Sequence, residues 1–474
     1  SSFFINAAHC LEIPIYSPVI LVIADRQKTV VYADLSMEET RGDGRIWVKK
    51  SQPIMVHPRS CASATPLRGE FYYLSNLDQN VASIIQTVYT FGPCKENGEV
   101  TAAGEVIREA LGRVLVHFYP FCGTLTQAPD GKLVVKCANN GVPFVEAAAD
   151  CSIAALGDIS MPRPEVVGQL VHTDSEANNI LETPLLTAQV TKFSCGGFVF
   201  GMAVNHCMVD GISAMEFVNC WAETARGVPL TVPPLVDRTI LRPRQPPRTP
   251  HRHDEFTEIQ DISGISRLYE DGEVVYRSFR FDTETMAKLK GMAAEGGAMG
   301  SCSSFTALTA FVWRARSAAL GMRPEQRTKL LFAVDGRSRL EPPLPGGYFG
   351  NGIVLTCCLC AAGELSRRPL SFAAEQVRDA IGRVTDGFIR SAIDHIVASR
   401  AKPSLTATLL ITSWTRLAFI ATDFGWGRPA QFGCVAPPER EVALFYPEKN
   451  TTTLLLGLPA AAMDTFQEIV SGVR

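Results

Sequence analysis

The sequence predicts an α/β protein made of two similar layered halves. Three observations indicate this: the length of 474 residues, a segment rich in proline and arginine near the middle, and a mixture of helix and strand patterns on both sides of it. A single hydrophobic core rarely grows beyond about 250–300 residues, so a chain of this length divides into two or three domains. We therefore expect mixed sheets with flanking helices in each half.

The first half alternates strand and helix patterns. Residues 81–91 (VASIIQTVYTF) are typical of a strand, and residues 99–123 carry apolar side chains at helical spacing until Pro120 and Gly123 end the pattern. Asp130 and Gly131 predict a turn that leads into a strand over 132–137. Residues 196–205 favour a strand and residues 212–227 a helix, so the residues between them form a strand-to-helix corner.

The second half repeats this mixture. A helix is predicted over 303–320, with Ser303 or Ser304 as its N-cap. Strands are predicted over 329–334, 407–414 and 440–447, and one long helix over 371–396.

The proline- and arginine-rich segment 233–256 has no apolar period, so it is expected to run over the surface as a linker. It separates domains at 48–232 and 257–474. Its His251, His253 and Asp254 resemble a metal site, but two alternate histidines in an exposed segment without a third ligand are expected to be solvated. We predict no metal.

Composition excludes several classes of function. The formal net charge is -3, with 46% hydrophobic and 20% charged residues and no basic block, which argues against nucleic acid and favours a small-molecule substrate. The 14 cysteines are scattered singly through apolar segments, which is typical of a reducing compartment. Cys357 and Cys360 form a CxxC inside a strand-like run and are interpreted as packing residues.

The apolar stretch 13–24 predicts no membrane insertion. It is shorter than the roughly 20 residues of a membrane span, contains Pro14 and Pro18, and has no basic region before it. We therefore expect a cytoplasmic protein.

The corner at 203–211 (AVNHCMVDG) carries the chemistry. His206 can face a cleft there and accept a proton near neutral pH, while Gly211 lets the backbone turn tightly. Asp210 is expected to point back into the protein and pair with an arginine. A lone histidine is more often only a hydrogen-bonded core residue, and Cys207 is a weak nucleophile candidate. The chain has no GxSxG, Walker A or HExxH motif.

The blocks HCMVDG (206–211), 333–353 (AVDGRSRLEPPLPGGYFGNGI) and TDFGWGRP (422–429), in this order, resemble the plant BAHD acyltransferases, which transfer acyl groups from coenzyme A thioesters to alcohols or amines. The resemblance runs from about residue 48 to the C-terminus. Residues 1–47 have no counterpart and no initiating Met, and are interpreted as a dispensable tail or a gene-model artefact. Residues 72–91, 391–419 and 440–447 look most like the hydroxycinnamoyl transferases that feruloylate ω-hydroxy fatty acids and fatty alcohols.

The resemblance implies two chloramphenicol-acetyltransferase-like domains with a channel between them, open at two mouths to His206. No metal or permanent cofactor is implied, only acyl-CoA as co-substrate. His206 would deprotonate the acceptor hydroxyl, which attacks the thioester directly without an acyl-enzyme. Asp210 would pair with Arg337, or failing that with Arg339. We expect a monomer.

Further roles follow from the resemblance. Thr412 and Trp414 would stabilise the oxyanion, and Arg416 matches a position that binds the shikimate carboxylate in related enzymes. The loop carrying Asp423 and Trp426 is interpreted as a structural element near the channel, although Asp423 is also a catalytic candidate.

Ser303 and Ser304 would meet coenzyme A phosphates at a helix N-terminus. Shikimate or quinate and polyamine remain alternative acceptors. A non-catalytic acyl-CoA binder and a thioesterase are the alternatives from other classes.

Overall fold

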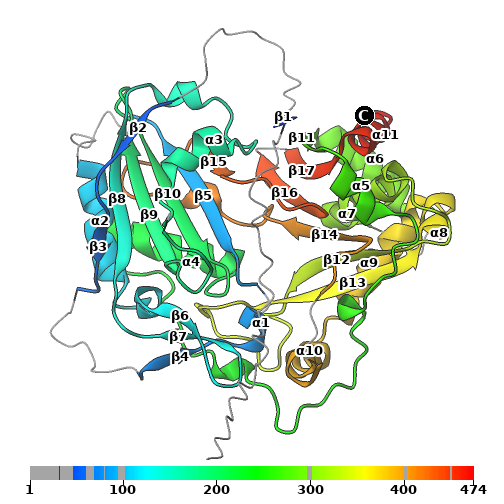
Figure 1. Cartoon of the computed structure of the whole chain (residues 1–474), viewed down its shortest axis with the longest axis horizontal. Coiled ribbons are helices and arrows are strands. Elements are labelled where there is room, and N and C mark those ends of the chain that lie inside the picture. The colour runs from blue at the N-terminus through cyan, green and yellow to red at the C-terminus, as the bar shows by residue number, and fades with distance from the viewer. Residues whose placement is uncertain are drawn as a thin grey trace, which may run out of the picture.

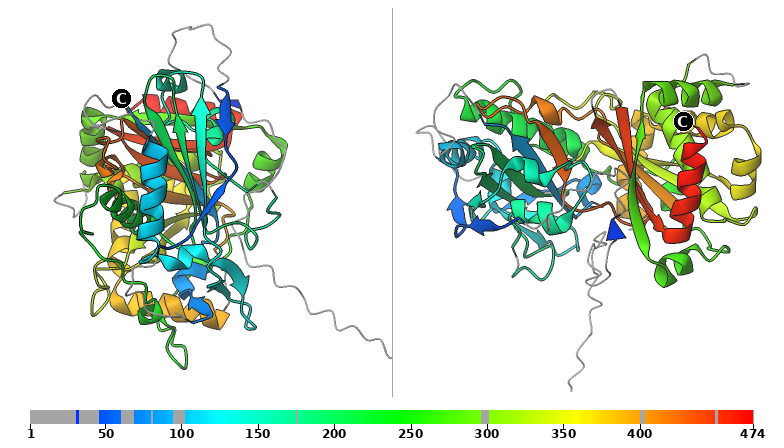
Figure 2. Two further views of the ribbon diagram at one scale, coloured as in Figure 1. Left: turned by 90° about the vertical axis from the view of Figure 1, so that its left-hand side faces the viewer. Right: turned by 90° about the horizontal axis from the view of Figure 1, so that it is seen from above.

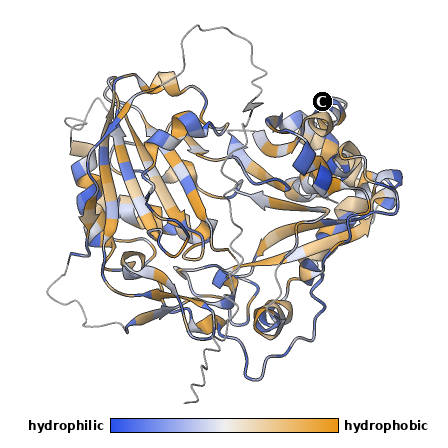
Figure 3. Ribbon diagram, in the orientation of Figure 1, coloured by the Kyte–Doolittle hydropathy of each residue, from blue (hydrophilic) through white to orange (hydrophobic). Residues whose placement is uncertain are grey.

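The computed structural model describes residues 31–32, 46–59, 69–79, 81–93, 102–174, 176–295, 301–399, 403–448 and 451–473. Two halves stand side by side, each built on a seven-stranded sheet that mixes parallel and antiparallel pairs (Figures 1 and 2). Hydrophobic residues are frequent along the strands of both sheets (Figure 3). The predicted α/β class with two mixed-sheet halves is confirmed.

The sheet of the first half has the order β15-β5-β10-β9-β8-β2, with β3 pairing the free part of β8. A small sheet, β4-β7-β6, lies below it in Figure 1. The bounds are β2 (Val48–Lys50), β3 (Ile54–Val56), β4 (Phe71–Tyr73), β5 (Ile84–Phe91), β6 (Thr124–Gln127), β7 (Leu133–Lys136), β8 (Val142–Ala149), β9 (Leu186–Lys192), β10 (Phe198–Asn205) and β15 (Gln431–Cys434).

Two helices, α2 (Ala103–Val114) and α4 (Gly211–Ala225), pack against each other beside this sheet, and two short helices are α1 (Asn76–Gln79) and α3 (Pro164–Val167). Most of the apolar stripe that the sequence predicted for α2 is buried, as Ile107 and Leu111 show. Trp221 of α4 donates its indole N–H to the Ile107 carbonyl at 2.8 Å, so α4 is held in a fixed position behind the sheet.

The sheet of the second half has the order β1-β11-β17-β16-β14-β12-β13. Its strands are β1 (Val31–Tyr32), β11 (Val274–Phe281), β12 (Arg327–Asp335), β13 (Ile353–Ala361), β14 (Thr408–Ser413), β16 (Val442–Glu448) and β17 (Thr451–Pro459). The helices of this half are α5 (Ile265–Asp271), α6 (Thr283–Ala294), α7 (Ser304–Ala319), α8 (Ala362–Arg367), α9 (Leu370–Arg383), α10 (Asp386–Ser399) and α11 (Ala460–Ser471). None of the helices within the described ranges has the length and apolar character needed to cross a membrane.

One predicted element needs correction. The long helix expected over 371–396 is two helices, α9 and α10, because the backbone leaves the helical region at Val384. The second half is not self-contained, because β15 pairs with β5 of the first sheet. Most of the extension 1–47 lies outside the described residues, although its Val31–Tyr32 pairs with β11.

The linker 233–256 is not a surface segment throughout, and its histidines are not all solvated as predicted. Arg238 and Leu241 are only 1% exposed, and His253 is buried. His253 bonds Glu255 at 2.6 Å and Ser391 at 2.8 Å through its two ring nitrogens. Specific polar partners, which a search for apolar periodicity cannot detect, hold the linker against both halves.

Candidate active site

His206 lies in the corner between β10, which ends at Asn205, and α4, which begins at Gly211. Its backbone N–H donates to the Ser83 carbonyl at 2.8 Å. The Asn205 side chain accepts from the Cys207 N–H at 3.1 Å. These bonds satisfy backbone groups that no longer pair within the sheet. They fix the shape of the strand-to-helix corner that the sequence predicted.

The Asp210 carboxylate forms an ion pair with Arg337. Arg337 approaches it with both terminal nitrogens, Nη1 at 2.8 Å from Oδ2 and Nη2 at 2.9 Å from Oδ1. Burial alone would lower the pKa of Arg337, but the Asp210 carboxylate raises it well above its ordinary value. Asp210 also caps α4, accepting from the Ser213 N–H at 3.0 Å. It therefore holds the corner in shape.

Arg337, and not Arg339, is the partner of Asp210. The Gly352 N–H adds a further bond to the Asp210 carboxylate at 2.9 Å. Arg339 instead donates to the carbonyls of Ile381 and Val384, at 2.8 Å each.

The predicted reason for glycine at position 211 was wrong. The φ of Gly211 is not in the left-handed region, because this residue is the first of α4. A Cβ at this position would lie 2.6 Å from Leu417 Cδ1. Close packing of a second-half side chain, rather than a tight turn, is what favours glycine here.

A cavity of about 250 Å³ lies beside His206, between the two sheets. Its lining comes from β5 and β10 of the first half and from β12, β13 and β14 of the second half. The walls are largely aliphatic, as in Val204, Leu331, Ile353, Leu355, Leu405 and Leu410. His206 Nδ1 is buried, and no described residue forms a hydrogen bond with it. The imidazole is therefore the basic side chain of a largely aliphatic chamber, whose other polar lining residues include Asp210 and Thr412.

Two of the three predicted oxyanion and acceptor residues lie at this cavity, and Arg416 does not. Thr412 and Trp414, at the end of β14, line it together with His206. Trp414 packs against Phe419 and Tyr446, with ring centroids 5.6 and 5.4 Å apart. Arg416 is exposed and is not a lining residue.

The loop with Asp423 and Trp426 borders a different pocket, next to α4. The Asp423 carboxylate accepts from the N–H groups of Gly425 at 2.8 Å and Gly427 at 3.0 Å. Both glycines have left-handed φ values, +110° and +81°, which other residues rarely adopt. Trp426 packs edge-on against Phe198, with ring centroids 5.6 Å apart. Asp423 thus shapes a turn and does not line the cavity of His206.

Ser303 and Ser304 lie at the N-terminus of α7. The Ser303 hydroxyl accepts from the Thr306 N–H at 3.0 Å and is the N-cap. Ser304 lines a separate surface pocket with Lys290. The predicted capping role belongs to Ser303.

The cysteines near the site serve as core residues. Cys207 is fully buried, and burial raises the pKa of its thiol. Burial likewise raises the pKa of Cys357 and Cys360, to about 12 for each thiol. The described part of the chain contains no group of three or more His, Cys, Asp or Glu side chains arranged to hold a metal ion.

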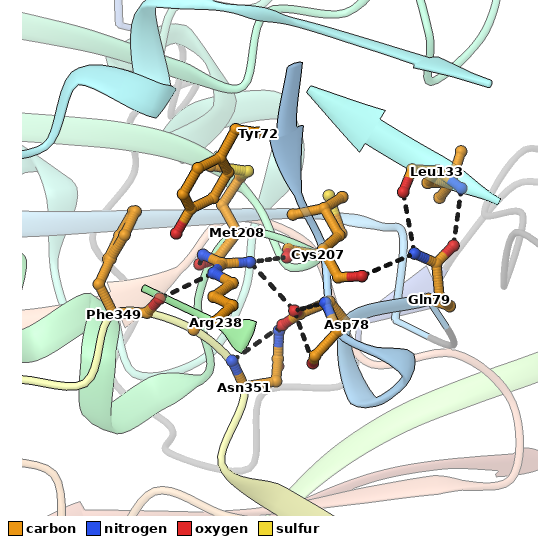
Figure 4. A network of polar contacts seen from close by, with 12 residues as sticks. Tyr72, Asp78, Gln79, Leu133, Cys207, Met208, Arg238, Phe349 and Asn351 are labelled. Carbon is orange, nitrogen blue, oxygen red and sulfur yellow. Dashed lines mark hydrogen bonds and ion pairs between the residues drawn. The ribbon is translucent and has the colours of Figure 1, made fainter. Parts of the chain in front are cut away.

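Sequence reasoning missed a buried network behind His206. Asp78, Arg238 and Asn351 come from three distant segments and meet under the corner (Figure 4). Asp78 belongs to the block LSNLDQN (74–80), part of the first range that resembles the feruloylating hydroxycinnamoyl transferases. The sequence offered one signal for this network: Asp78 is the only charged residue in this short block.

Solved structures share this architecture. Vinorine synthase matches with a TM-score of 0.70 and 23% identity, over 90% of this chain and 98% of that chain. F. graminearum TRI101 in complex with coenzyme A and T-2 mycotoxin matches with a TM-score of 0.67 and 18% identity, over 84% and 97%. The two halves with an interfacial cavity form the chloramphenicol-acetyltransferase-like fold.

Sequence comparison places the chain more closely. The model of the Transferase family matches residues 55–472. The chain is 55% identical over 427 residues to omega-hydroxypalmitate O-feruloyl transferase of Arabidopsis thaliana, covering 89% of this chain and 92% of that protein. It is 50% identical over 430 residues to fatty alcohol:caffeoyl-CoA acyltransferase of the same plant, covering 89% and 98%. The chain belongs to this family, the BAHD acyltransferases, and is an acyl-CoA-dependent O-acyltransferase.

Proposed function

We propose that the chain transfers a feruloyl-type hydroxycinnamoyl group from coenzyme A to the hydroxyl of an ω-hydroxy fatty acid or a fatty alcohol. The observation that carries this proposal is the aliphatic cavity beside His206. Apolar walls stabilise an alkyl chain by removing it from water, at about 25 cal/mol per Å² of apolar surface. The names of the two plant relatives support the same donor and acceptor classes.

In this mechanism His206 is the general base. It takes the proton from the acceptor hydroxyl as the oxygen attacks the thioester carbonyl. The tetrahedral intermediate then collapses, the C–S bond breaks, and the proton on His206 passes to the leaving thiolate. General-base help of this kind contributes about 10² to 10⁴ in rate.

The oxyanion of the intermediate needs a donor, and the hydroxyl of Thr412 is the proposed one. Thr412 lines the same cavity as His206. A preorganised donor in a chamber with little water stabilises developing charge more strongly than the same donor in water. Trp414, also in the lining, is the second candidate.

The alternative acceptors fit the cavity less well. Shikimate and quinate carry a carboxylate on the same small ring as the reacting hydroxyl, whereas the carboxylate of an ω-hydroxy fatty acid lies at the far end of the alkyl chain. No lysine or arginine is among the described residues that line the cavity, so a carboxylate close to the reacting hydroxyl would have no cationic partner there. Arg416, the predicted carboxylate partner, is exposed outside it. A polyamine would need a free acid, and Asp210, the acid in the lining, is already paired with Arg337.

Coenzyme A phosphates are proposed to bind at the N-terminus of α7. That helix has 16 residues, and its first N–H groups favour anions. Lys290 lines the pocket beside Ser304 and adds positive charge. The Ser303 hydroxyl already caps the helix, so Ser304 is the better phosphate contact.

We also infer a cytoplasmic location. Cys195 is an exposed free thiol, and Cys207, Cys357, Cys358 and Cys360 are buried free thiols. Free thiols are typical of reducing compartments.

The test is an acyl-transfer assay with feruloyl-CoA and four acceptors: 16-hydroxypalmitate, 1-hexadecanol, shikimate and spermidine. We expect ester formation with the two long-chain alcohols and none with His206→Ala that has kept its fold. Product with shikimate alone would overturn the acceptor. Coenzyme A release without any acceptor, followed as free thiol, would indicate a thioesterase, and no release with any acceptor would indicate a non-catalytic binder.

A further inference from the structure

Asp78, Arg238 and Asn351 form a buried polar network (Figure 4), and Arg238 and Asn351 bond the backbone carbonyls of residues 206 to 208. Asp78 belongs to α1, Arg238 to the linker, and Asn351 to the loop before β13. Each is at most 1% exposed. Charged groups rarely leave water completely unless they are paired and hydrogen-bonded. We therefore asked which groups these three side chains bind and what those bonds do.

Asn351 connects the carboxylate of Asp78 to the carbonyl of His206. Its Nδ2 donates to Asp78 Oδ1 at 2.8 Å and to the His206 carbonyl at 2.9 Å. Its backbone N–H donates to the same Oδ1 at 2.9 Å. The other carboxylate oxygen of Asp78 accepts from the N–H and the hydroxyl of Ser75, at 2.7 Å each. Neither side chain can move far without breaking several bonds.

Arg238 holds the next two carbonyls along the corner. Its Nη1 donates to the Cys207 carbonyl at 3.1 Å and its Nη2 to the Met208 carbonyl at 2.5 Å. Nη1 also lies 3.2 Å from Asp78 Oδ2. The planar guanidinium fork suits this task, since it presents its donors in a fixed geometry. The carbonyls of three successive residues, 206 to 208, are thus bound by one network.

The aromatic surroundings of Arg238 keep water away from it. The guanidinium carbon lies 5.1 Å from the ring centroid of Tyr72 and 5.0 Å from that of Phe349. Its Nε donates to the Phe349 carbonyl at 2.8 Å. Cation–π contacts of this kind strengthen when they are desolvated. The network is therefore rigid as well as buried.

The imidazole of His206 depends on this backbone for its direction. In many catalytic sites a carboxylate or carbonyl bonds the second ring nitrogen and fixes the tautomer and orientation. Here Nδ1 is buried without a hydrogen bond from any described residue, and the Asp210 carboxylate is turned to Arg337. What remains to orient the ring is the position of its own backbone and the packing around it.

We propose that Asp78, Arg238 and Asn351 are positioning residues that aim His206 at the reacting hydroxyl by fixing the carbonyls of residues 206 to 208. The proposal rests on the proposed role of His206 as general base. None of the three lines the cavity, so they touch neither substrate. They act on the turnover step through the geometry of the base.

The experiment compares kcat and KM of Asn351→Ala, Arg238→Lys and Asp78→Asn, each measured well below its own melting transition. A misplacement of the order of 1 Å costs about 10²-fold in rate. We therefore expect kcat to fall about 10- to 100-fold, while KM for feruloyl-CoA and for the alcohol stays within about twofold. Arg238→Lys keeps the charge opposite Asp78 but not the fork, so it should retain the fold best and still lose kcat.

Glu441→Gln is the matched control. Glu441 forms a comparably buried ion pair with Arg316, with Oε2 2.9 Å from Nε, in the second half and outside the cavity lining. This variant should lose stability and keep kcat. If the three network variants lose no more kcat than Glu441→Gln does, the network is merely structural and the inference is wrong.

His206→Ala in the same assays distinguishes a failure of the proposed general base from a failure of the proposed positioning role. Activity retained in that variant would remove the general base and the proposed function with it. An inactive His206→Ala beside fully active network variants would overturn the positioning role alone.

Discussion

Arg337 donates two hydrogen bonds to the Asp210 carboxylate, 2.8 and 2.9 Å long, and so ties the corner that carries His206 in the first half to the second half. The Asp210 side chain is 1% exposed and that of Arg337 14%. This buried ion pair therefore joins the corner before α4 in the first half to the segment after β12 in the second half.

Asp210→Ala should lower the free energy of unfolding by about 3–5 kcal/mol, because it leaves Arg337 buried without its partner. Asp335→Ala is the control. Asp335 also contacts Arg337, at 3.1 Å, but its side chain is 42% exposed, and exposed pairs contribute about 0–1 kcal/mol. Urea unfolding of both variants measures the difference. Equal losses would show that Asp210 is not the structural anchor.

Cys207→Ala should keep kcat within about twofold, because a general-base mechanism needs no covalent nucleophile. Burial raises the pKa of the Cys207 thiol, so the thiolate is scarce at neutral pH. Intact-mass spectrometry during turnover should show no acylated protein. An acyl adduct on wild type that disappears in this variant would instead establish a two-step reaction through Cys207.

Asp423→Asn should keep most of the activity, and Asp423→Ala should not. The asparagine side chain still offers an oxygen to the N–H groups of Gly425 and Gly427, which the carboxylate now binds. Alanine leaves both donors without a partner, at a cost of about 1–3 kcal/mol. Thermal unfolding and steady-state assays of the two variants check this. Loss of activity in a stable Asp423→Asn would make the charge of Asp423 part of the chemistry.

The protein should lose stability as the pH falls below about 6.5, and His395 should contribute to that loss. Burial lowers the pKa of His395, and the neighbouring His253 lowers it further; their ring centroids are 4.8 Å apart. Below about pH 6.5 His395 is protonated more fully in the unfolded chain than in the folded protein. The free energy of unfolding therefore decreases as the pH falls. Urea midpoints at about pH 7.5 and 5.5 should differ less in His395→Gln than in wild type. An unchanged difference would contradict the assignment.

Local patterns predicted the elements that short segments can specify. The stripe of α2, the cap at Ser303 and the corner at His206 each depend on residues within a few positions of one another. The Asp210 partner was reached only because a family resemblance placed position 337 near it.

Contacts between distant segments were beyond such patterns. Asp78, Arg238 and Asn351 lie more than a hundred positions apart from one another in the sequence. No local sequence pattern predicts that they are in contact. The linker was expected at the surface because it lacks apolar periodicity. Yet polar partners bury parts of it: Arg238 bonds the carbonyls of Cys207 and Met208, and His253 bonds Glu255 and Ser391. The insertion of β15 beside β5 depends on the same kind of tertiary pairing.

Thr412→Val tests the proposed oxyanion donor. Valine has the shape of threonine but no hydroxyl, so packing in the cavity is preserved while the donor is lost. Removal of one oxyanion donor costs about 10² to 10³ in kcat, whereas Thr412→Ser should keep most of the rate. Thr408→Val, in the same strand, is the control, because the Thr408 hydroxyl bonds the carbonyls of Ser404 and Thr406 and lies outside the cavity lining. That variant should lose stability and keep kcat. Full activity of Thr412→Val would leave Trp414 or a backbone N–H as the group that stabilises the intermediate.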